Sequence, residues 1–359
     1  MSKLCLHCLA LSVLIAAVTF AQQNPVPALS PRPQPASTAA PAAGEGRIHL
    51  DVVVTDKSGK PVAGLGLNDF TLLDNGQPSK ILSFTAINGT AQKADPPVEV
   101  ILLLDMVNLP FSQVSITRQH IDRFLRQNSG HLAQPVSLFV LTDKSLDVQG
   151  QPSTDGSAQA EAFSQIGARL RSPGFESDSY GEIDRIQMSL KTLSAITNYE
   201  GGKPGRKLLI WVGPGWPLLD QPNIKRTAKG KQEDFQNIVE FSTRLREARV
   251  SVYSISFGQP NSRTVLYESF LKGVKTEDKA IPPDLGLKVL AVESSGRVLG
   301  PGGDLAAQID SCIDDAQAYY RISFDPPPAD GPNEYHDLKV QIDKPKLTAR
   351  TNTGYYNQP

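Results

Sequence analysis

Residues Val98–Asp105 read Val-Glu-Val-Ile-Leu-Leu-Leu-Asp, a short and almost continuous apolar run that ends in a carboxylate. Such a run is typical of a strand that is covered on both faces, as in the middle of a parallel sheet. In open α/β sheets, ligand-binding groups lie just beyond the carboxyl ends of the strands. The stretch therefore predicts a central strand, with Asp105 at the edge of the sheet where ligands bind.

The chain after Asp105 alternates between apolar strands and amphipathic helices. Further strands are expected at 135–141, 207–212, 250–257 and 296–299. Helices are expected at 114–127, 158–170, 183–196, 235–248, 285–292 and 305–316. Alternation of this kind predicts an α/β fold with a doubly wound, mostly parallel sheet.

Both flanks of this pattern have the two-residue alternation of β-strands. The N-terminal flank predicts strands at 48–54, 70–74 and 81–84, and the C-terminal flank predicts strands at 318–324, 336–342 and 348–356. Asn75-Gly76 predicts a tight hairpin whose returning strand is 81–84. The few strands at either end, with one apolar face, are not enough to close a sandwich alone. We therefore expect both ends to form one β-sandwich around the inserted α/β domain. Independent tail strands are the alternative, and they would leave two unpaired sheet edges.

The first 21 residues have the features of a secretory signal peptide. Lys3 precedes an apolar run at Leu9–Phe20, and small residues at Thr19 and Ala21 favour cleavage after Ala21. The run is too short to span a bilayer comfortably, so we expect export to the periplasm or beyond the cell, without membrane insertion of the mature chain. Cys312 is then the one cysteine left, which excludes a disulfide within the mature chain, and its amphipathic context predicts burial.

These patterns divide the chain into five parts. They are a signal peptide at 1–21, a Pro/Ala-rich linker at 22–46, a first β-sandwich part at 47–93, the α/β domain at 94–317 and a second β-sandwich part at 318–359.

Composition and motifs argue against several function classes. Lys and Arg number 36 against 37 Asp and Glu, for a net charge of −1. With no basic block to bind phosphates, nucleic acid is not an expected partner. The sequence has neither a Gly-x-Ser-x-Gly nor a His-Glu-x-x-His motif, and no two histidines have metal-ligand spacing. We therefore expect no enzymatic activity.

Several stretches together carry a resemblance to a known family. They are Leu50–Asp56, Gly64–Phe70, Asp74–Gly76, Leu103–Asn108, Pro204–Trp211 and Tyr335–Leu338. In this order the chain resembles the secreted bacterial proteins with a von Willebrand factor type A-related domain that are abundant in acidobacteria. The resemblance covers Ile48–Tyr356. It implies a von Willebrand A-like fold at 94–317 and an exported protein that acts through protein contacts, without an established catalytic activity.

The type A fold commonly carries a metal-ion-dependent adhesion site, and the resemblance assigns its first ligand to Asp105. The two serine positions of the family's Asp-x-Ser-x-Ser motif are Val107 and Leu109 here, and the position of the second Asp is Gly213. Mg²⁺ needs several oxygen ligands, so we expect a degenerate site and no cofactor. Asp105 would instead cap a helix or accept hydrogen bonds from loop amides. A Mg²⁺ site rebuilt from other residues is the alternative.

We expect an unidentified protein partner to dock on the loops that follow Asp105, Thr142 and Val212. The candidate contact residues are Asn108, Thr142, Asp143, Ser179, Gly213 and Trp216. For Trp216, a core position and an exposed contact position are both open. The expected function is an exported, non-enzymatic interaction and adhesion module. The alternatives are a metal-dependent adhesin, a hydrolase and a structural envelope protein.

Overall fold

The structure, a computed structural model, describes residues 46–88, 94, 96–166, 179–216, 227–256 and 267–359. The predicted signal peptide and nearly all of the predicted linker lie outside these residues. Within them, no helix combines the length and the apolar character that crossing a membrane requires.

A six-stranded sheet lies at the centre of the molecule. Its strands are β5 (Glu99–Asp105), β6 (His131–Leu141), β7 (Leu146–Asp155), β8 (Lys207–Val212), β9 (Val250–Ile255) and β10 (Val298–Leu299). The order is β10-β9-β8-β5-β6-β7, and every neighbouring pair is parallel except β6–β7. Counted from β5, this is the 3-2-1-4-5-6 order of doubly wound sheets. The prediction of a mixed α/β fold with a mostly parallel sheet is confirmed.

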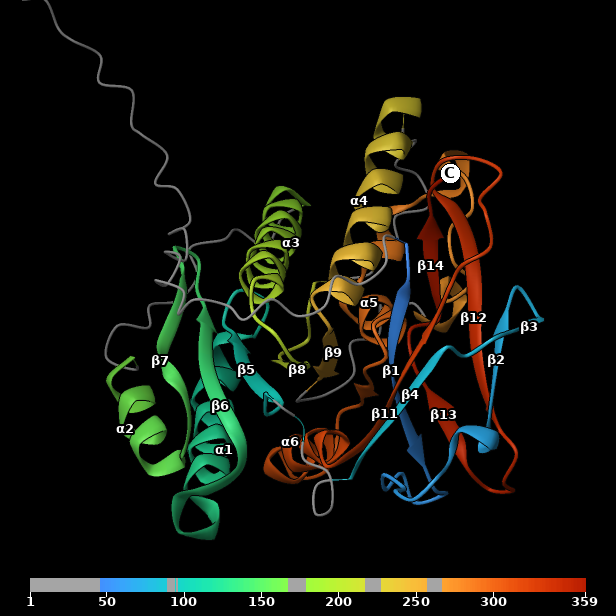
Figure 1. Cartoon of the computed structure of the whole chain (residues 1–359). Helices are drawn as coiled ribbons and strands as arrows, with labels where there is room; N and C mark the ends of the chain where they lie inside the picture. The colour runs from blue at the N-terminus through green and yellow to red at the C-terminus, as the bar shows by residue number, and fades with distance from the viewer. Residues whose placement is uncertain (1–45, 89–93, 95, 167–178, 217–226, 257–266) are drawn as a thin grey trace, which may run out of the picture.

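Helices cover both faces of this sheet (Figure 1). One face carries α1 (Phe111–Gly130), α2 (Gly156–Ile166) and α6 (Leu305–Ile313), and the other carries α3 (Ser179–Gly201), α4 (Ala228–Glu247) and α5 (Leu287–Glu293). Leu102 and Leu104 of β5 pack toward the first face, and Ile101 and Leu103 toward the second. Two covered faces explain why the run before Asp105 is apolar at nearly every position.

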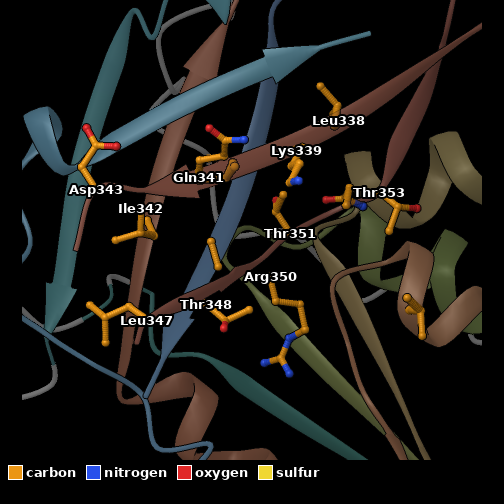
Figure 2. Close-up of a pocket in the computed structure, with 14 residues that line it drawn as sticks. Leu338, Lys339, Gln341, Ile342, Asp343, Leu347, Thr348, Arg350, Thr351 and Thr353 are labelled. Atoms are coloured by element: carbon orange, nitrogen blue, oxygen red, sulfur yellow. The ribbon is translucent and has the colours of Figure 1, made fainter. Parts of the chain in front are cut away.

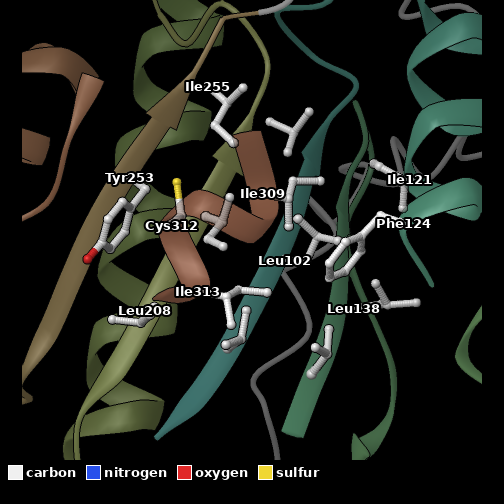
Figure 3. Close-up of a cluster of buried hydrophobic side chains, with 14 of the residues drawn as sticks. Leu102, Ile121, Phe124, Leu138, Leu208, Tyr253, Ile255, Ile309, Cys312 and Ile313 are labelled. Carbon is white, nitrogen blue, oxygen red and sulfur yellow. The ribbon is translucent and has the colours of Figure 1, made fainter. Parts of the chain in front are cut away.

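Cys312 lies in the first of these cores. Figure 3 shows it with Ile309 and Ile313 of α6, opposite Leu102 of β5 and Phe124 of α1. Its side chain is fully buried, and burial raises the pKa of the thiol to about 12. The expected packing role of Cys312 is the one that the structure gives it.

Strands from the two ends of the described chain pair with one another in two antiparallel sheets. The first sheet has the order β13 (Thr348–Arg350), β1 (Ile48–Thr55), β11 (Ala318–Phe324), β4 (Ser83–Asn88). The second has the order β14 (Gly354–Asn357), β12 (Glu334–Ile342), β2 (Phe70–Asp74), β3 (Gln77–Ser79). The blue N-terminal strands and the red C-terminal strands lie side by side in Figure 1. Leu50, Leu72 and Val340 belong to one core between the two sheets.

The predicted strands differ from the structure in three places. The strand expected at 348–356 is two strands, β13 and β14, which belong to different sheets. The strand that returns from Asn75-Gly76 is β3, not 81–84, because the chain leaves this sheet after Ser79 and β4 pairs with β11 in the other sheet. Strand β7 has no counterpart in the sequence prediction. Its segment Gln149–Ser153 contains Gln, Gly and Pro, so the alternation of apolar and polar residues that marks a strand is missing.

Short 3-10 helices complete the described elements. They are η1 (Leu67–Asp69), η3 (Tyr267–Phe270), η4 (Glu277–Lys279), η5 (Pro282–Leu285) and η6 (Asp314–Ala316).

Candidate functional site

The candidate site lies where the winding of the central sheet reverses. From β5 the chain proceeds outward through β6 and β7, and it then returns to the opposite side of β5 as β8. Crevices at such switch points, outside the carboxyl ends of the strands, are the usual ligand sites of open α/β sheets. Asp105 ends β5 at this point, and Gly213 directly follows β8.

Asp105 is fully buried and accepts four hydrogen bonds. Its Oδ1 accepts the backbone N–H groups of Val107 at 3.1 Å and Asn108 at 3.0 Å. Its Oδ2 accepts Nδ2 of Asn108 at 2.8 Å and Nε1 of Trp211 at 2.9 Å. Burial raises the pKa of the carboxyl group, and the four hydrogen bonds oppose this rise. Since a carboxylate offers about four lone-pair sites, its accepting capacity is used up.

Gly213 closes the same position from the side of β8. Its φ is +152°, and a Cβ built on it would lie 2.8 Å from Cβ of Asp105. A side chain therefore does not fit here, let alone a second carboxylate. Val107 and Leu109, at the serine positions of the family motif, are both buried in apolar cores.

These residues do not fit a Mg²⁺ site. Mg²⁺ requires near-octahedral oxygen ligands, whereas N–H donors occupy Asp105 and apolar side chains or a glycine stand at the other positions. The described part of the chain also holds no group of three or more His, Cys, Asp or Glu residues that could bind a metal ion.

Asn108 links Asp105 to the helix layer. Its Nδ2 also donates to Oγ of Ser189 in α3 at 3.0 Å, and that hydroxyl donates to the carbonyl of Arg185. The sequence prediction included Asn108 but missed Ser189 and Trp211. A signal for Trp211 was available, because a Trp inside a buried strand needs an acceptor for its indole N–H.

Trp216 lies in the core, so the exposed-contact interpretation does not hold. It is 4% exposed, its Nε1 donates to the carbonyl of Leu285 at 2.8 Å, and its ring meets that of Trp211 edge-on with 5.4 Å between centroids. Gly213 is likewise buried. Trp216 and Gly213 are therefore not available as surface contacts, because both are packed inside the protein near Asp105.

Thr142 and Asp143 belong to the turn between β6 and β7. Oγ1 of Thr142 donates to the carbonyl of Ser145 and accepts the N–H groups of Lys144 and Ser145. The hydroxyl of Thr142 therefore builds its own turn. Both residues are half-buried. Ser179 begins α3, but its side chain lies outside the described residues.

Phe111, which the sequence prediction did not include, is the prominent exposed residue of this edge. It is the first residue of α1, follows the loop of Asp105 and Asn108, and is 66% exposed. Ile183, in the first turns of α3, is 40% exposed. No signal in the sequence marked this exposure, because Phe111 is spaced three residues before Val114 and fourteen before Leu125, as a member of the apolar stripe would be.

Comparisons with known proteins give no family. No family model and no curated protein matches the chain. A solved structure of the human COPII-coat protein Sec24c is similar at TM-score 0.32 and 10% identity, over 73% of this chain and 44% of that one. The SpRpn10 VWA domain is similar at TM-score 0.31 and 13% identity, over 61% and 96%. The TFIIH p34 N-terminal domain is similar at TM-score 0.23 and 9% identity, over 45% and 80%.

This chain thus spans less than half of the Sec24c chain. All three TM-scores are below 0.5, so the fold class follows from the strand order of this chain itself. That class is a doubly wound, mostly parallel α/β sheet with one antiparallel edge strand, packed beside two antiparallel sheets.

Proposed function

We propose that this protein is an exported, non-enzymatic module that binds another protein through the carboxyl end of its central sheet, without a metal ion. The observation that carries the proposal is the exposure of Phe111. Its side chain is 66% exposed, beside the buried Asp105, whose carboxylate oxygens already accept four hydrogen bonds. Aromatic residues are enriched at protein interfaces, where a few of them supply most of the binding free energy.

The closed site gives Phe111 a stiff support. The backbone N–H groups of Val107 and Asn108 donate hydrogen bonds to Asp105 and so fix the loop that leads into α1. A contact residue on a rigid element loses less conformational entropy on binding than one on a loose loop. In this proposal Asp105 is a positioning residue that orders the docking face.

The wider architecture belongs to the same proposal. A von Willebrand A-like domain at 94–317 is inserted in a β-sandwich that the terminal strands build together. The signal peptide at 1–21 directs export, and the mature chain acts as an adhesion or interaction protein in the periplasm or outside the cell. Support comes from the strand order of the central sheet and from the antiparallel pairing of β1 with β11.

A pull-down with the mature protein tests the docking face. The bait is compared with Phe111→Ala and with Ile116→Ala, which removes another exposed apolar residue of the same helix. We expect Phe111→Ala to weaken partner capture by about tenfold or more, as for an interface hot spot, and Ile116→Ala to leave it unchanged. EDTA should have no effect. Equal capture by all three baits would refute the docking face, and EDTA-sensitive capture would favour the metal-dependent adhesin.

A further inference from the structure

A cavity of 540 Å³ lies between β12 and β13. One wall is Leu338–Asp343 and the other is Leu347–Thr353, as Figure 2 shows. The two walls belong to different sheets, because β12 pairs with β2 whereas β13 pairs with β1. We call this hollow the β12 groove.

The course of the chain explains why the groove is open. Residues Thr351–Thr353 carry the chain from β13 in one sheet to β14 in the other, and β14 then pairs only with Glu334–Asp337 of β12. The following part of β12, Leu338–Ile342, pairs with β2 on one side. On its other side, no strand among the described residues pairs with it.

The backbone of this part of β12 directs unused hydrogen-bonding groups into the groove. In an antiparallel pair, successive residues direct their N–H and C=O groups to opposite sides. Asp337 uses its carbonyl for Asn75 on the β2 side, whereas Leu338 uses its N–H for Thr353 on the groove side. Val340 and Ile342 therefore face the groove, and within the described chain neither backbone has a partner there.

Charged side chains lie near this segment: Lys339 and Asp343 line the groove, and Lys346 lies in the turn that joins its two walls. Lys339 and Lys346 are exposed, and so is Asp343. None of the three forms an ion pair within the described part of the chain, whereas Lys344 pairs with Asp69. The free charge at the rim of the groove is therefore positive by one, which favours a peptide that carries a carboxylate.

We propose that the β12 groove binds an extended, acidic peptide segment of a partner protein, which adds to the open edge of β12 as a further strand. Addition of a strand to a sheet edge gives affinity through main-chain hydrogen bonds. At ~3.3 Å per residue, Leu338–Ile342 accommodates a strand of about five residues. The occupant has no proline at the pairing positions, because proline lacks the N–H that a ladder requires.

This last condition argues against the chain's own N-terminal segment as the occupant. That segment carries Pro25, Pro27, Pro31, Pro33, Pro35 and Pro41. The β12 groove is also built from different elements than the face of Phe111, so the inference does not depend on the function proposed above.

Amide hydrogen exchange, followed by NMR on the full mature chain, tests the inference. The probe is a synthetic peptide of alternating Val and Glu. We expect it to slow exchange at Val340 and Ile342 by about tenfold at a concentration about ten times its Kd. The backbone N–H groups of Lys339 and Gln341 point toward β2. They should be protected from exchange both with and without the peptide, which gives a control within the strand.

Matched peptides and variants separate strand addition from unspecific binding. Two peptides carry N-methyl groups on the two alternating sets of amides. Methylation of the set whose N–H groups face β12 should abolish protection, and methylation of the set that faces away should not. Lys339→Glu should weaken binding about two- to fivefold, the effect of an exposed charge pair. Lys144→Glu, in the exposed turn between β6 and β7 at the far edge of the central sheet, should not weaken it. The proposal fails if Val340 and Ile342 are already protected in the free protein, if the peptide protects neither, or if a proline-interrupted peptide protects them equally.

Discussion

At the scale of single residues, the site around Asp105 shows how a binding position of an α/β sheet can become part of the core. The carboxylate remains at the carboxyl end of β5, but its four acceptor positions serve two loop amides, one side-chain amide and one indole. A metal ion in this place would have to displace these donors. Gly213 leaves no room for a second carboxylate that would compensate.

Substitution of Asp105 should therefore affect stability and not metal binding. Asp105→Asn replaces one acceptor oxygen by an N–H₂ group that opposes the donors of Asn108 and Trp211. Buried donors left without an acceptor cost about 1–3 kcal/mol each, so we expect a loss of about 2–6 kcal/mol in the free energy of unfolding.

Urea denaturation measures this loss, and Asp143→Asn in the half-buried turn serves as the control. Mg²⁺ and EDTA should leave the melting temperature of both the wild type and the variant unchanged. A rise in the melting temperature with Mg²⁺ that disappears in Asp105→Asn would contradict the closed site.

The sequence could place Asp105, because an apolar run that ends in a carboxylate identifies a buried strand and its end. It could not place the distant hydrogen-bond partners of Asp105 and Asn108, which are Trp211 and Ser189, respectively. Trp211 and Ser189 come from β8 and α3, which only the three-dimensional packing brings to β5. For the same reason, the sequence allowed both a core and a surface position for Trp216. The acceptor of its indole N–H is the carbonyl of Leu285, far along the chain.

At the scale of elements, prediction succeeded where burial leaves a pattern in the side chains, either a continuous apolar run or an alternation, and failed where it leaves none. Strand β8 has the predicted bounds because both of its faces are covered. Strand β7 is a polar antiparallel edge strand, and its pairing with β6 depends on the backbone, which leaves little trace in side-chain pattern. The same reasoning explains β3, whose three residues include a proline at the edge of the sheet.

The C-terminal end of α5 predicts a dependence of stability on pH. Burial, followed by the negative charge of Asp284, raises the pKa of Glu293 to about 8, and burial raises the pKa of Asp284 to about 6. A carboxyl group with a raised pKa in the folded state binds its proton more tightly there than in the unfolded state. Its contribution to stability is therefore present at low pH and is lost as the pH rises toward the folded-state pKa.

Between pH 6 and pH 8 we expect the free energy of unfolding to fall, by up to about 1.4 kcal/mol per pH unit for the one proton on Glu293. Glu293→Gln, which mimics the neutral acid, should flatten this fall and be more stable than the wild type at pH 8. Glu277→Gln in the exposed η4 should behave like the wild type. Denaturation curves at pH 6, 7 and 8 measure the effect, and a parallel fall in all three proteins would exclude Glu293 as its source.

At the scale of the whole molecule, the terminal sheets and the central sheet share apolar cores. Leu50 and Val52 of β1 pack toward the second antiparallel sheet, whereas Val53 packs with β5 and α6. Tyr319 of β11 and Ile87 of β4 join Val53 in that core. Arg249, between α4 and β9, donates to Asp51 of β1 through both Nε and Nη2, at 2.7–3.1 Å. The sheet of β1 is therefore a middle layer with partners on both faces.

This arrangement predicts that the central sheet loses stability when the C-terminal strands are removed. Both tryptophans of the chain, Trp211 and Trp216, lie in the core beside β5, so their fluorescence reports unfolding of the central sheet alone. Deletion of residues 318–359 removes Tyr319 from the shared core and removes the strand between β1 and β4. Loss of one large buried aromatic side chain costs about 3–5 kcal/mol, a large part of a domain's stability of roughly 5–15 kcal/mol.

We therefore expect the urea midpoint of tryptophan fluorescence to fall markedly and amide protection at Val52, Val53 and Val54 to disappear. Deletion of Gln358 and Pro359, which are exposed at the end of the chain, is the control and should change neither quantity. If the tryptophan transition kept its midpoint while protection in β1 was lost, the central sheet would fold on its own, and the shared core would contribute nothing measurable to its stability.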